Sequence, residues 1–463
     1  IYDLNTFTTD EAIMPTRGGD WYDGGFWQGL FLHKWGVNND AILNTWEYLY
    51  RTIILCNRSL KGIADFGVQH PDTDVSALQA EVRALRAMFY YYAMDLFGRI
   101  PLIVSHDNTG TDMKQVERSV LFRFIVKELQ ESLPLLSSER SNWPGEYYGR
   151  MTQGVACFLL AKLALNAEVY TDDNWTDGQR PDGKQIMFNI DGTERNAWET
   201  TIHYCERLTA MGYILEPDYT ANFAVFNESS TENIFIIPMD KNLYTNQYIY
   251  LFRSRNYNHA AAYGLGGENG SSATIEVLET FDYDTPQQDA RFDYCYFAGP
   301  VKDLSGNQIY LDDKVTPLVY EPWNVKLDVS GETYEKTAGA RMKKYEVDTK
   351  AYKDGKLFDN DIVVFRYADA LLMQAEAKVR NGQNGDNELN AVRQRVGEET
   401  RTATLENILA ERQLELAWEG WRSQDLIRFG QFTIPVRNWK TKPVAIPRFS
   451  RFRNPLSSGT AKA

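Results

Sequence analysis

The most informative segment of this chain reads Glu411-Arg412-Gln413-Leu414-Glu415-Leu416-Ala417-Trp418-Glu419-Gly420-Trp421-Arg422-Ser423-Gln424-Asp425-Leu426-Ile427-Arg428. Four apolar residues recur at intervals of three and four, which predicts one face of a helix; they are Leu414, Ala417, Trp418 and Trp421. A second stripe carries Glu411, Glu415 and Glu419. Like charges four residues apart repel in an isolated helix. We therefore expect a buried helix whose glutamates pair with arginines from other segments.

This ion network is interpreted as internal architecture and not as a ligand site. Glu411, Glu415 and Arg422 are expected to be mostly buried. Arg366 and Arg393 are the candidate partners of the glutamates. The main value of the segment lies in the order of its residues, which is specific enough to compare with a known family.

The pattern E-R-x-x-E-L-x-x-E-G-x-R-x-x-D-L-x-R resembles the C-terminal signature of the SusD/RagB family, which comprises surface nutrient-binding lipoproteins of Bacteroidetes-type bacteria. Six further pieces follow in family order, with Asn233 in place of Glu in E-x-I-F and Ala290 in place of Pro in D-P-R. These pieces are Asp20-Trp21-Tyr22-Asp23-Gly24-Gly25, Glu81-Val82-Arg83 through Arg99-Ile100-Pro101-Leu102, Asn233-Ile234-Phe235, Asp289-Ala290-Arg291, Phe365-Arg366-Tyr367-Ala368-Asp369 through Ala375-Glu376-Ala377, and Leu389-Asn390-Ala391-Val392-Arg393.

The composition is that of an ordinary globular protein, with 463 residues, 43% apolar and 24% charged. No run approaches the roughly 20 apolar residues of a membrane span. The net charge of −14 argues against nucleic acid as a partner, because phosphates would be repelled. The four cysteines lie far apart without a C-x-x-C, and the five histidines have no metal-ligand spacing. We expect no cofactor and no metal; a disulfide stays possible in an exported protein.

The apolar periodicity predicts mostly α structure. The expected helices are 40–62, 78–96, 119–133, 151–170, 197–211, 365–380, 386–396 and 405–420. Between about residues 216 and 360 short β-like runs alternate with Gly, Asn and Ser clusters, which indicates a loop-rich, partly β central excursion. The resemblance implies that the helices, about 40–215 and 361–430, form a scaffold of tetratricopeptide-like pairs. We expect residues 1–463 to form a single SusD-like domain.

Aromatic residues in loops are the candidate ligand contacts. A sugar ring offers an apolar C–H face to flat aromatic side chains and a hydroxyl rim to Asn, Asp, Arg and Gln. Two segments carry this mixture, 17–35 and 240–263, the second with Tyr244, Tyr248 and Tyr250. Trp21 belongs to a shared family piece, and a structural role is expected for it. The candidate ligand-binding residues are Trp27, Trp35, Tyr257, Tyr263 and Trp323, and they should line one shallow, open surface.

The resemblance implies a non-enzymatic protein on the extracellular face of the outer membrane, held by a lipid on an N-terminal cysteine outside this sequence. Such a protein captures a glycan and hands it to a SusC-like TonB-dependent transporter, on which it sits as a lid. Two alternatives stay open. One is a peptide- or protein-binding repeat scaffold for nutrient uptake. The other is an α-helical glycoside hydrolase, which would need two carboxylates ~5–10 Å apart in a cleft.

Overall fold

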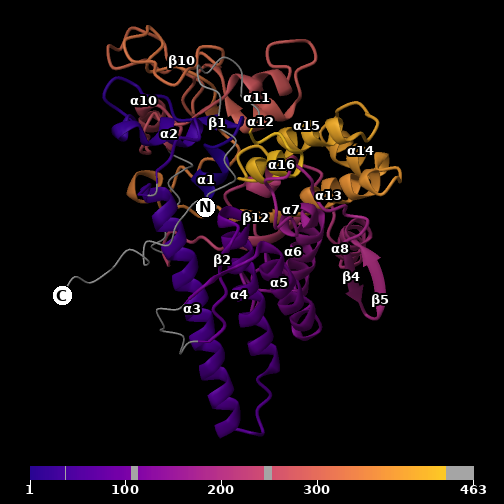
Figure 1. Cartoon of the computed structure of the whole chain (residues 1–463). Coiled ribbons are helices and arrows are strands. Elements are labelled where there is room, and N and C mark those ends of the chain that lie inside the picture. Colours follow the sequence, from indigo (N-terminus) through magenta and orange to yellow (C-terminus); the bar gives the residue numbers. More distant parts are fainter. Residues whose placement is uncertain (37, 106–112, 244–252, 434–463) are drawn as a thin grey trace, which may run out of the picture.

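Packed helix pairs form the scaffold of the molecule in a computed structural model that describes residues 1–36, 38–105, 113–243 and 253–433. Helix α3 packs against α4, α4 against α5, α6 against α8, and α13 against α8, α14 and α15. In Figure 1 the α3–α4 hairpin projects below the rest of the molecule. The scaffold helices are α3 (Asp40–Gln69), α4 (Ser76–Phe97), α5 (Arg118–Ser132), α6 (Gln153–Leu165), α7 (Ala167–Tyr170), α8 (Ala197–Ala210), α13 (Tyr367–Arg380), α14 (Asp386–Arg395), α15 (Leu405–Glu415) and α16 (Arg422–Arg428).

Short helices and loops form the upper part of the molecule in Figure 1. They come from the N-terminal segment and from the central excursion. The short helices are α1 (Tyr2–Thr6), α2 (Phe26–Phe31), α10 (Tyr257–Ala262), α11 (Ile275–Thr280) and α12 (Arg291–Cys295), with 3-10 turns η1 (Asp23–Gly25), η3 (Tyr219–Phe223) and η4 (Lys353–Gly355); a further 3-10 turn, η2 (Leu133–Leu135), follows α5 in the scaffold. The structure confirms a mostly α fold with a loop-rich, partly β excursion.

Every sheet among the described residues is a pair of antiparallel strands. The longest contact joins β6 to β12, with Ile362 opposite Ile237 and a register shift on either side of Phe365. The pairs are β1 (Ala12–Ile13) with β7 (Ser272–Ala273), β2 (Ile100–Pro101) with β3 (Gln115–Val116), β4 (Met187–Ile190) with β5 (Thr193–Asn196), β6 (Asn233–Ile237) with β12 (Ile362–Arg366), β8 (Tyr296–Phe297) with β11 (Arg341–Met342), and β9 (Gly299–Pro300) with β10 (Val319–Tyr320).

The N-terminal segment is bound firmly to the central excursion. Strand β1 pairs with β7, and Thr16 bridges to Asp328. The buried Arg17 guanidinium donates to the Glu335 carbonyl at 2.7 Å, to the Ala338 carbonyl at 3.0 Å and to Ser272 Oγ at 2.8 Å. The N-terminal segment and the central excursion therefore converge in space.

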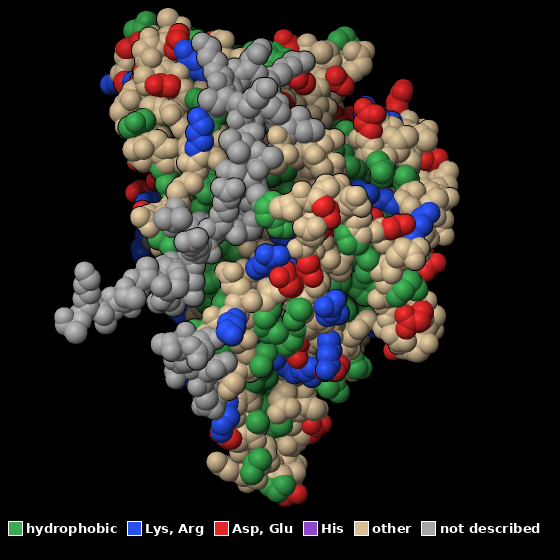
Figure 2. Space-filling model, viewed as in Figure 1, with side chains coloured by type: hydrophobic (Ala, Val, Ile, Leu, Met, Phe, Trp, Pro, Cys, Tyr) green, Lys and Arg blue, Asp and Glu red, His purple; other side chains and the backbone are tan. Residues whose placement is uncertain are grey.

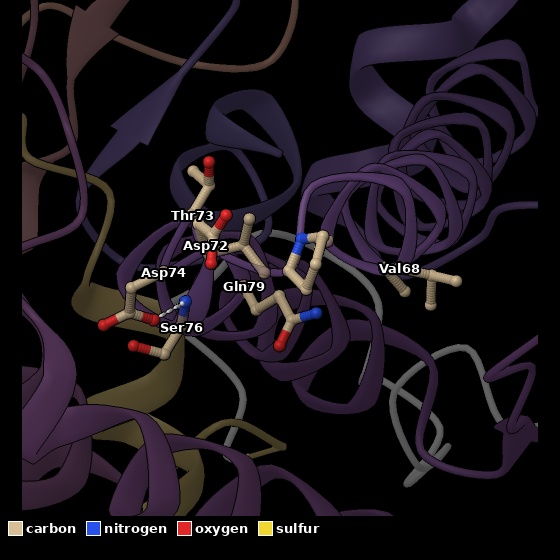
Figure 3. Close-up of a pocket in the computed structure, with 10 residues that line it drawn as sticks. Val68, Asp72, Thr73, Asp74, Ser76 and Gln79 are labelled. Carbon is tan, nitrogen blue, oxygen red and sulfur yellow. Dashed lines mark hydrogen bonds between the residues drawn. The ribbon is translucent and has the colours of Figure 1, made fainter.

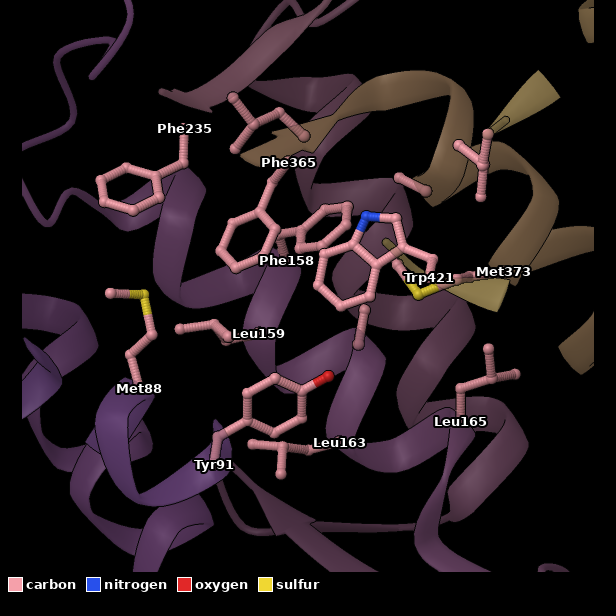
Figure 4. Packing of buried hydrophobic residues seen from close by; sticks show 14 of the residues in the cluster. Met88, Tyr91, Phe158, Leu159, Leu163, Leu165, Phe235, Phe365, Met373 and Trp421 are labelled. Carbon is pink, nitrogen blue, oxygen red and sulfur yellow. The ribbon is translucent and has the colours of Figure 1, made fainter. Parts of the chain in front are cut away.

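The core is centred on α6, whose sequence is apolar nearly all round. Phe158 stacks on Phe365 of β12 with ring centroids 4.5 Å apart, and Phe365 lies 5.9 Å from Trp421 (Figure 4). Ala161 and Ala164 of α6 are fully buried and let the neighbouring helices approach closely. The buried apolar residues of this cluster extend along the chain from Leu4 to Trp421.

The helix of the opening segment is shorter than its periodicity predicts. Helix α15 ends at Glu415, and Trp418 has a left-handed φ of 64°. In a longer helix the backbone groups of Ala417 and Trp418 would bond within the helix. Here they have other partners: the Trp418 N–H donates to Glu11 Oε1 at 2.9 Å, and the Ala417 carbonyl accepts from Lys344 Nζ at 2.8 Å. The prediction of one helix over 405–420 is wrong, because these tertiary contacts outweigh the local pattern.

Two other helix boundaries also differ from the sequence pattern. Helix α3 continues past Gly62 to Gln69, because a single glycine costs only about 1 kcal/mol within a long helix. The helix expected over 151–170 breaks at Asn166, whose side chain donates to the Lys162 carbonyl at 2.9 Å and accepts from Arg428 Nη1 at 3.1 Å. Local side-chain hydrogen bonds of this kind compete with helical ones.

The predicted ion network is present and buried. Arg291 Nη1 lies 2.6 Å from Glu411 and 2.9 Å from Glu415, Arg366 Nη1 lies 2.5 Å from Glu415, and Arg393 Nη1 lies 2.5 Å from Glu411. Five carboxylates thus meet five cations: Glu232, Asp289, Glu411, Glu415 and Glu419 with Arg291, Lys344, Arg366, Arg393 and Arg395. Arg422, also buried, pairs instead with Asp10 at 2.7 Å.

Glu232 is a member of this network that the sequence pattern alone did not reveal. Its carboxylate lies 2.8 Å from Arg366 and 2.9 Å from Arg395, and its side chain is fully buried. Glu232 directly precedes Asn233, so the chain reads Glu232-Asn233-Ile234-Phe235. All fixed positions of the E-x-I-F motif are therefore present, with Glu232 as its glutamate and Asn233 at the variable position. The interpretation of Asn233 as a replacement of the glutamate is wrong by one residue.

The four cysteines are free and buried. Burial raises the pKa of the Cys157 thiol to about 11, as expected for a thiol that packs like a small apolar side chain. Within residues 1–36, 38–105, 113–243 and 253–433 we find no helix with the length and apolar character to cross a bilayer.

Candidate ligand-binding surface

Tyr257 begins helix α10 and is the most clearly exposed of the predicted ligand residues, at 47%. Its hydroxyl donates to Asp20 Oδ2 at 3.0 Å, which joins the N-terminal segment to the excursion. The next side chain, Asn258, donates from Nδ2 to the carbonyl of the exposed Tyr310 at 3.0 Å. We refer to Asp20, Tyr257, Asn258 and Tyr310 as the Tyr257 surface.

Hydrogen bonds between buried polar residues hold helix α10 in place. The Asn256 N–H donates to the Tyr320 hydroxyl at 2.9 Å, and His259 Nδ1 lies 3.0 Å from the same oxygen. Burial, together with Arg255 and Arg341, lowers the pKa of His259 to about 3, so its ring is neutral. Because β10 carries Tyr320, the exposed end of α10 stands on a rigid support, as a binding surface requires.

The surface combines flat rings with hydrogen-bonding groups. Burial and the Asp20 carboxylate raise the pKa of Tyr257 to about 12, so its hydroxyl stays protonated at physiological pH. Asp20 and Asn258 add an acceptor and an amide beside the ring. Rigid aromatic side chains bury a large area at a low entropy cost, and neighbouring polar groups orient the ligand.

Two predicted residues on the N-terminal segment are buried or half-buried. Trp27 is only 8% exposed, lies 5.3 Å from Phe7 and donates its indole N–H to Asp23 at 2.9 Å. We therefore reassign Trp27 to the core, because its apolar ring gains more from packing against Phe7 and Trp21 than from exposure to water. Trp35 is half-buried, with its ring 5.2 Å from His33.

The other two predicted residues lie on the excursion. Tyr263 is half-buried at the end of α10, and its hydroxyl donates to the Lys302 carbonyl at 3.2 Å. Trp323 is 45% exposed, and its ring lies 6.0 Å from that of Tyr283. The five candidates thus differ in exposure. Trp27 is buried, Trp35 and Tyr263 are half-buried, and only Tyr257 and Trp323 are exposed to a large extent.

Some expectations fall on other parts of the chain. Tyr244, Tyr248 and Tyr250 lie outside the described residues, as does His106. The structural role expected for Trp21 is confirmed, since its indole N–H donates to the Glu268 carbonyl at 2.9 Å. Tyr310 was missed by the sequence reading; it follows the polar turn Ser305-Gly306-Asn307-Gln308, which marks a loop and could have suggested it.

Two other features do not suggest ligand chemistry. Among the residues that the structure describes, no group of three or more His, Cys, Asp or Glu side chains could hold a metal ion. A hollow of about 600 Å³ lies at the tip of the α3–α4 hairpin (Figure 3). Its lining holds no aromatic side chain, and its polar groups bond locally, as Asp74 does to the Ser76 N–H at 2.9 Å.

A scaffold of paired helices that carries a loop-built aromatic surface defines a helical-repeat binding protein. Residues 208–455 match the model of the SusD family, and residues 5–165 match a family described as starch-binding and associating with the outer membrane. The first match covers more than half of the chain, and the chain belongs to the SusD family. This family match also confirms the prediction of a binding protein and not an enzyme.

Known relatives support the same assignment. The starch-binding protein SusD of Bacteroides thetaiotaomicron is 24% identical over 407 residues, which cover 80% of this chain and 67% of that protein. A SusD-like carbohydrate-binding protein from Bacteroides fragilis has a TM-score of 0.70 at 20% identity, over 93% of this chain and 80% of its own. Surface glycan-binding protein A of Bacteroides thetaiotaomicron, in complex with laminarihexaose, has a TM-score of 0.68 at 20% identity, over 93% and 85%. These structures share the fold.

Proposed function

We propose that this protein binds a glycan at the bacterial surface, with the Tyr257 surface and Trp323 as the contacts. The observation that carries the proposal is the convergence of the N-terminal segment and the excursion at Tyr257 and Asp20 in a member of the SusD family. The names of similar proteins, a starch-binding protein and a glycan-binding protein in complex with laminarihexaose, support a carbohydrate ligand.

We also propose the setting in which this binding works. The protein is held on the extracellular face of the outer membrane by an N-terminal lipid and delivers its glycan to a SusC-like TonB-dependent transporter. The family description, which names association with the outer membrane, supports this location. The same proposal treats residues 1–463 as one SusD-like domain, supported by the shared core from Leu4 to Trp421. Co-purification of a transporter with the full-length lipoprotein from its native membrane tests the partnership.

A binding screen tests the ligand class. The protein is run through native gels that contain single polysaccharides, among them starch, laminarin, xylan and pectin, and is titrated in parallel with mixed peptides. Retardation by at least one polysaccharide is expected. Retention of peptides alone would replace the glycan proposal with the peptide-uptake alternative.

A substitution at an exposed candidate residue should weaken ligand affinity without a loss of stability, and a substitution at a buried one should lower stability. Binding is expected with a Kd in the micromolar to millimolar range, roughly −8 to −4 kcal/mol. Tyr257→Ala and Trp323→Ala should weaken it roughly tenfold or more without a change in melting temperature. Trp27→Ala should instead lower the free energy of unfolding by ~3–5 kcal/mol, because it empties a core position. Calorimetric titration and thermal melts of each variant provide both quantities.

The controls for this prediction are a surface tyrosine and the two half-buried candidates. Tyr48→Ala on α3 removes a ring that is 55% exposed and should change neither quantity. Trp35→Ala and Tyr263→Ala complete the set. If no variant loses affinity at constant stability, the glycan site lies elsewhere on the protein.

The protein should show no turnover of any polysaccharide that it binds. Prolonged incubation is expected to release no reducing ends, because the proposed mechanism is binding and release. The measurement is a reducing-sugar assay with a glycoside hydrolase as the positive control. Reproducible release that disappears on replacement of a single Asp or Glu would favour the hydrolase alternative.

A further inference from the structure

A pocket of about 830 Å³ opens on the helical scaffold, away from the Tyr257 surface. It lies between the ends of α4, α5, α7 and α16, below the upper part of the molecule in Figure 1. Its volume falls within the roughly 300–1,000 Å³ of small-molecule sites. The side chains that matter for its chemistry are Asp95, Arg118, Asp172, Trp175, Arg180 and Phe429.

The loop that forms one wall of the pocket is tied down at both ends. At its start, Asp173 accepts from the Ser119 N–H at 3.0 Å and from Ser119 Oγ at 2.6 Å, at the beginning of α5. At its end, Arg180 donates to the carbonyls of Arg428 at 2.8 Å and Ile427 at 2.7 Å, in the last turn of α16. Trp175 lies between these two anchors along the chain and lines the pocket.

The loop that forms this wall carries polar groups that have no hydrogen-bond partner among the described residues. Trp175 is 40% exposed, and its indole N–H has no acceptor among the described residues. Asp172 Oδ1 accepts from the Asn174 N–H at 3.1 Å, while Oδ2 has no partner within the described ranges. Burial raises the pKa of Asp172, although Arg118 and Arg180 oppose this. Figure 2 shows basic, acidic and hydrophobic side chains mixed over α5 to α7, with no single-sign patch.

We propose that this pocket, which we call the Trp175 pocket, is a second carbohydrate-binding site that takes part of an oligosaccharide. Trp175 would stack on the C–H face of a sugar ring, Asp172 Oδ2 would accept from its hydroxyls, and Arg180 would donate to them. Among the charged side chains that line the pocket, Arg428 pairs with Glu376 and Asp425, and Arg118 and Arg180 are offset by Asp95 and Asp172; this balance suits an uncharged sugar. A second site on the same chain would raise the avidity for a long polysaccharide without any change at the first site.

The test uses titration calorimetry of the whole protein with hexasaccharides of α-1,4-glucan, β-1,3-glucan, β-1,4-xylan and β-1,4-mannan. Wild-type protein is expected to bind at least one of them, and Trp175→Ala should weaken the affinity of one site roughly tenfold or more. Asp172→Asn should weaken the same site while it keeps the acceptor for the Asn174 N–H. Melting temperatures of both variants should match that of the parent.

A matched control is Trp143→Ala, which removes another surface tryptophan, 44% exposed, from a different loop and should leave binding unchanged. Wild-type binding in both Trp175→Ala and Asp172→Asn would overturn the Trp175 pocket alone. Binding that depends on Trp175 but survives Tyr257→Ala and Trp323→Ala would support the pocket and remove the Tyr257 surface from the proposed function. Failure of wild-type protein to bind any hexasaccharide would overturn both sites.

Discussion

Glu415→Ala is expected to lower the free energy of unfolding by about 3–5 kcal/mol. The Glu415 side chain is fully buried, with its carboxylate 2.9 Å from Arg291 and 2.5 Å from Arg366 and in contact with Arg395. Burial alone would raise the pKa of Glu415, but Arg395, Arg366 and Arg291 hold it well below its ordinary value. Arg291, Arg366 and Arg395 keep other carboxylate partners, but removal of this carboxylate leaves the buried network one negative charge short, which costs far more than the loss of a surface pair.

Urea unfolding at pH 7, followed by circular dichroism, measures this effect. Glu415→Gln keeps the shape but not the charge and should also destabilise the fold. Glu406→Ala is the matched control on the same helix, because Glu406 is exposed and contributes at most about 0.3–1 kcal/mol through the helix dipole. A Glu415→Ala variant as stable as Glu406→Ala would show that the buried network adds little to stability.

Glu11→Gln is expected to make the protein more stable at pH 8 by up to about 3 kcal/mol, while little change is expected near pH 4.5. Glu11 is buried; Oε1 accepts from the Trp418 N–H, and Oε2 is left without a partner among the described residues. Burial raises the pKa of Glu11 from 4.5 to about 7, although the Trp418 N–H, Arg422 and Lys344 oppose this shift. A neutral amide avoids the cost of a buried charge.

The sign of this pH dependence follows from proton binding. Between pH 4.5 and 7 the folded protein holds a proton on Glu11 that the unfolded chain has lost, so this group's contribution to stability falls as pH rises through that window. Arg428 and Arg380 lower the pKa of Glu376 to about 2 despite its burial, so its effect is confined to more acidic solutions. Unfolding curves of both proteins at pH 5, 6, 7 and 8 provide the comparison. A difference that stays constant with pH would contradict a raised pKa for Glu11.

The candidate site was only partly accessible to sequence reasoning. Tyr257 and Trp323, chosen because they fall in polar loops, are exposed at 47% and 45%. Trp27, chosen on the same grounds, is buried, because the rings of Phe7 and Trp21 pack against it. Tyr310 and Trp175 were not chosen. Loop composition predicts that an aromatic residue lies near the surface, but whether its ring faces water depends on which distant segment packs over it.

The order of charged and apolar residues was enough to predict the helices of the scaffold and the burial of Glu411 and Glu415 with Arg366 and Arg393 as candidate partners, while the structure assigned Arg393 to Glu411 and Arg366 to Glu415. Periodicity and family motifs are local properties, and they persist along most of the chain. The end of α15 at Glu415, the role of Glu232 and the pocket beneath Trp175 were decided by tertiary structure. Each depends on a partner hundreds of residues away or on another element, such as Glu11 for Trp418, and local sequence does not encode such contacts.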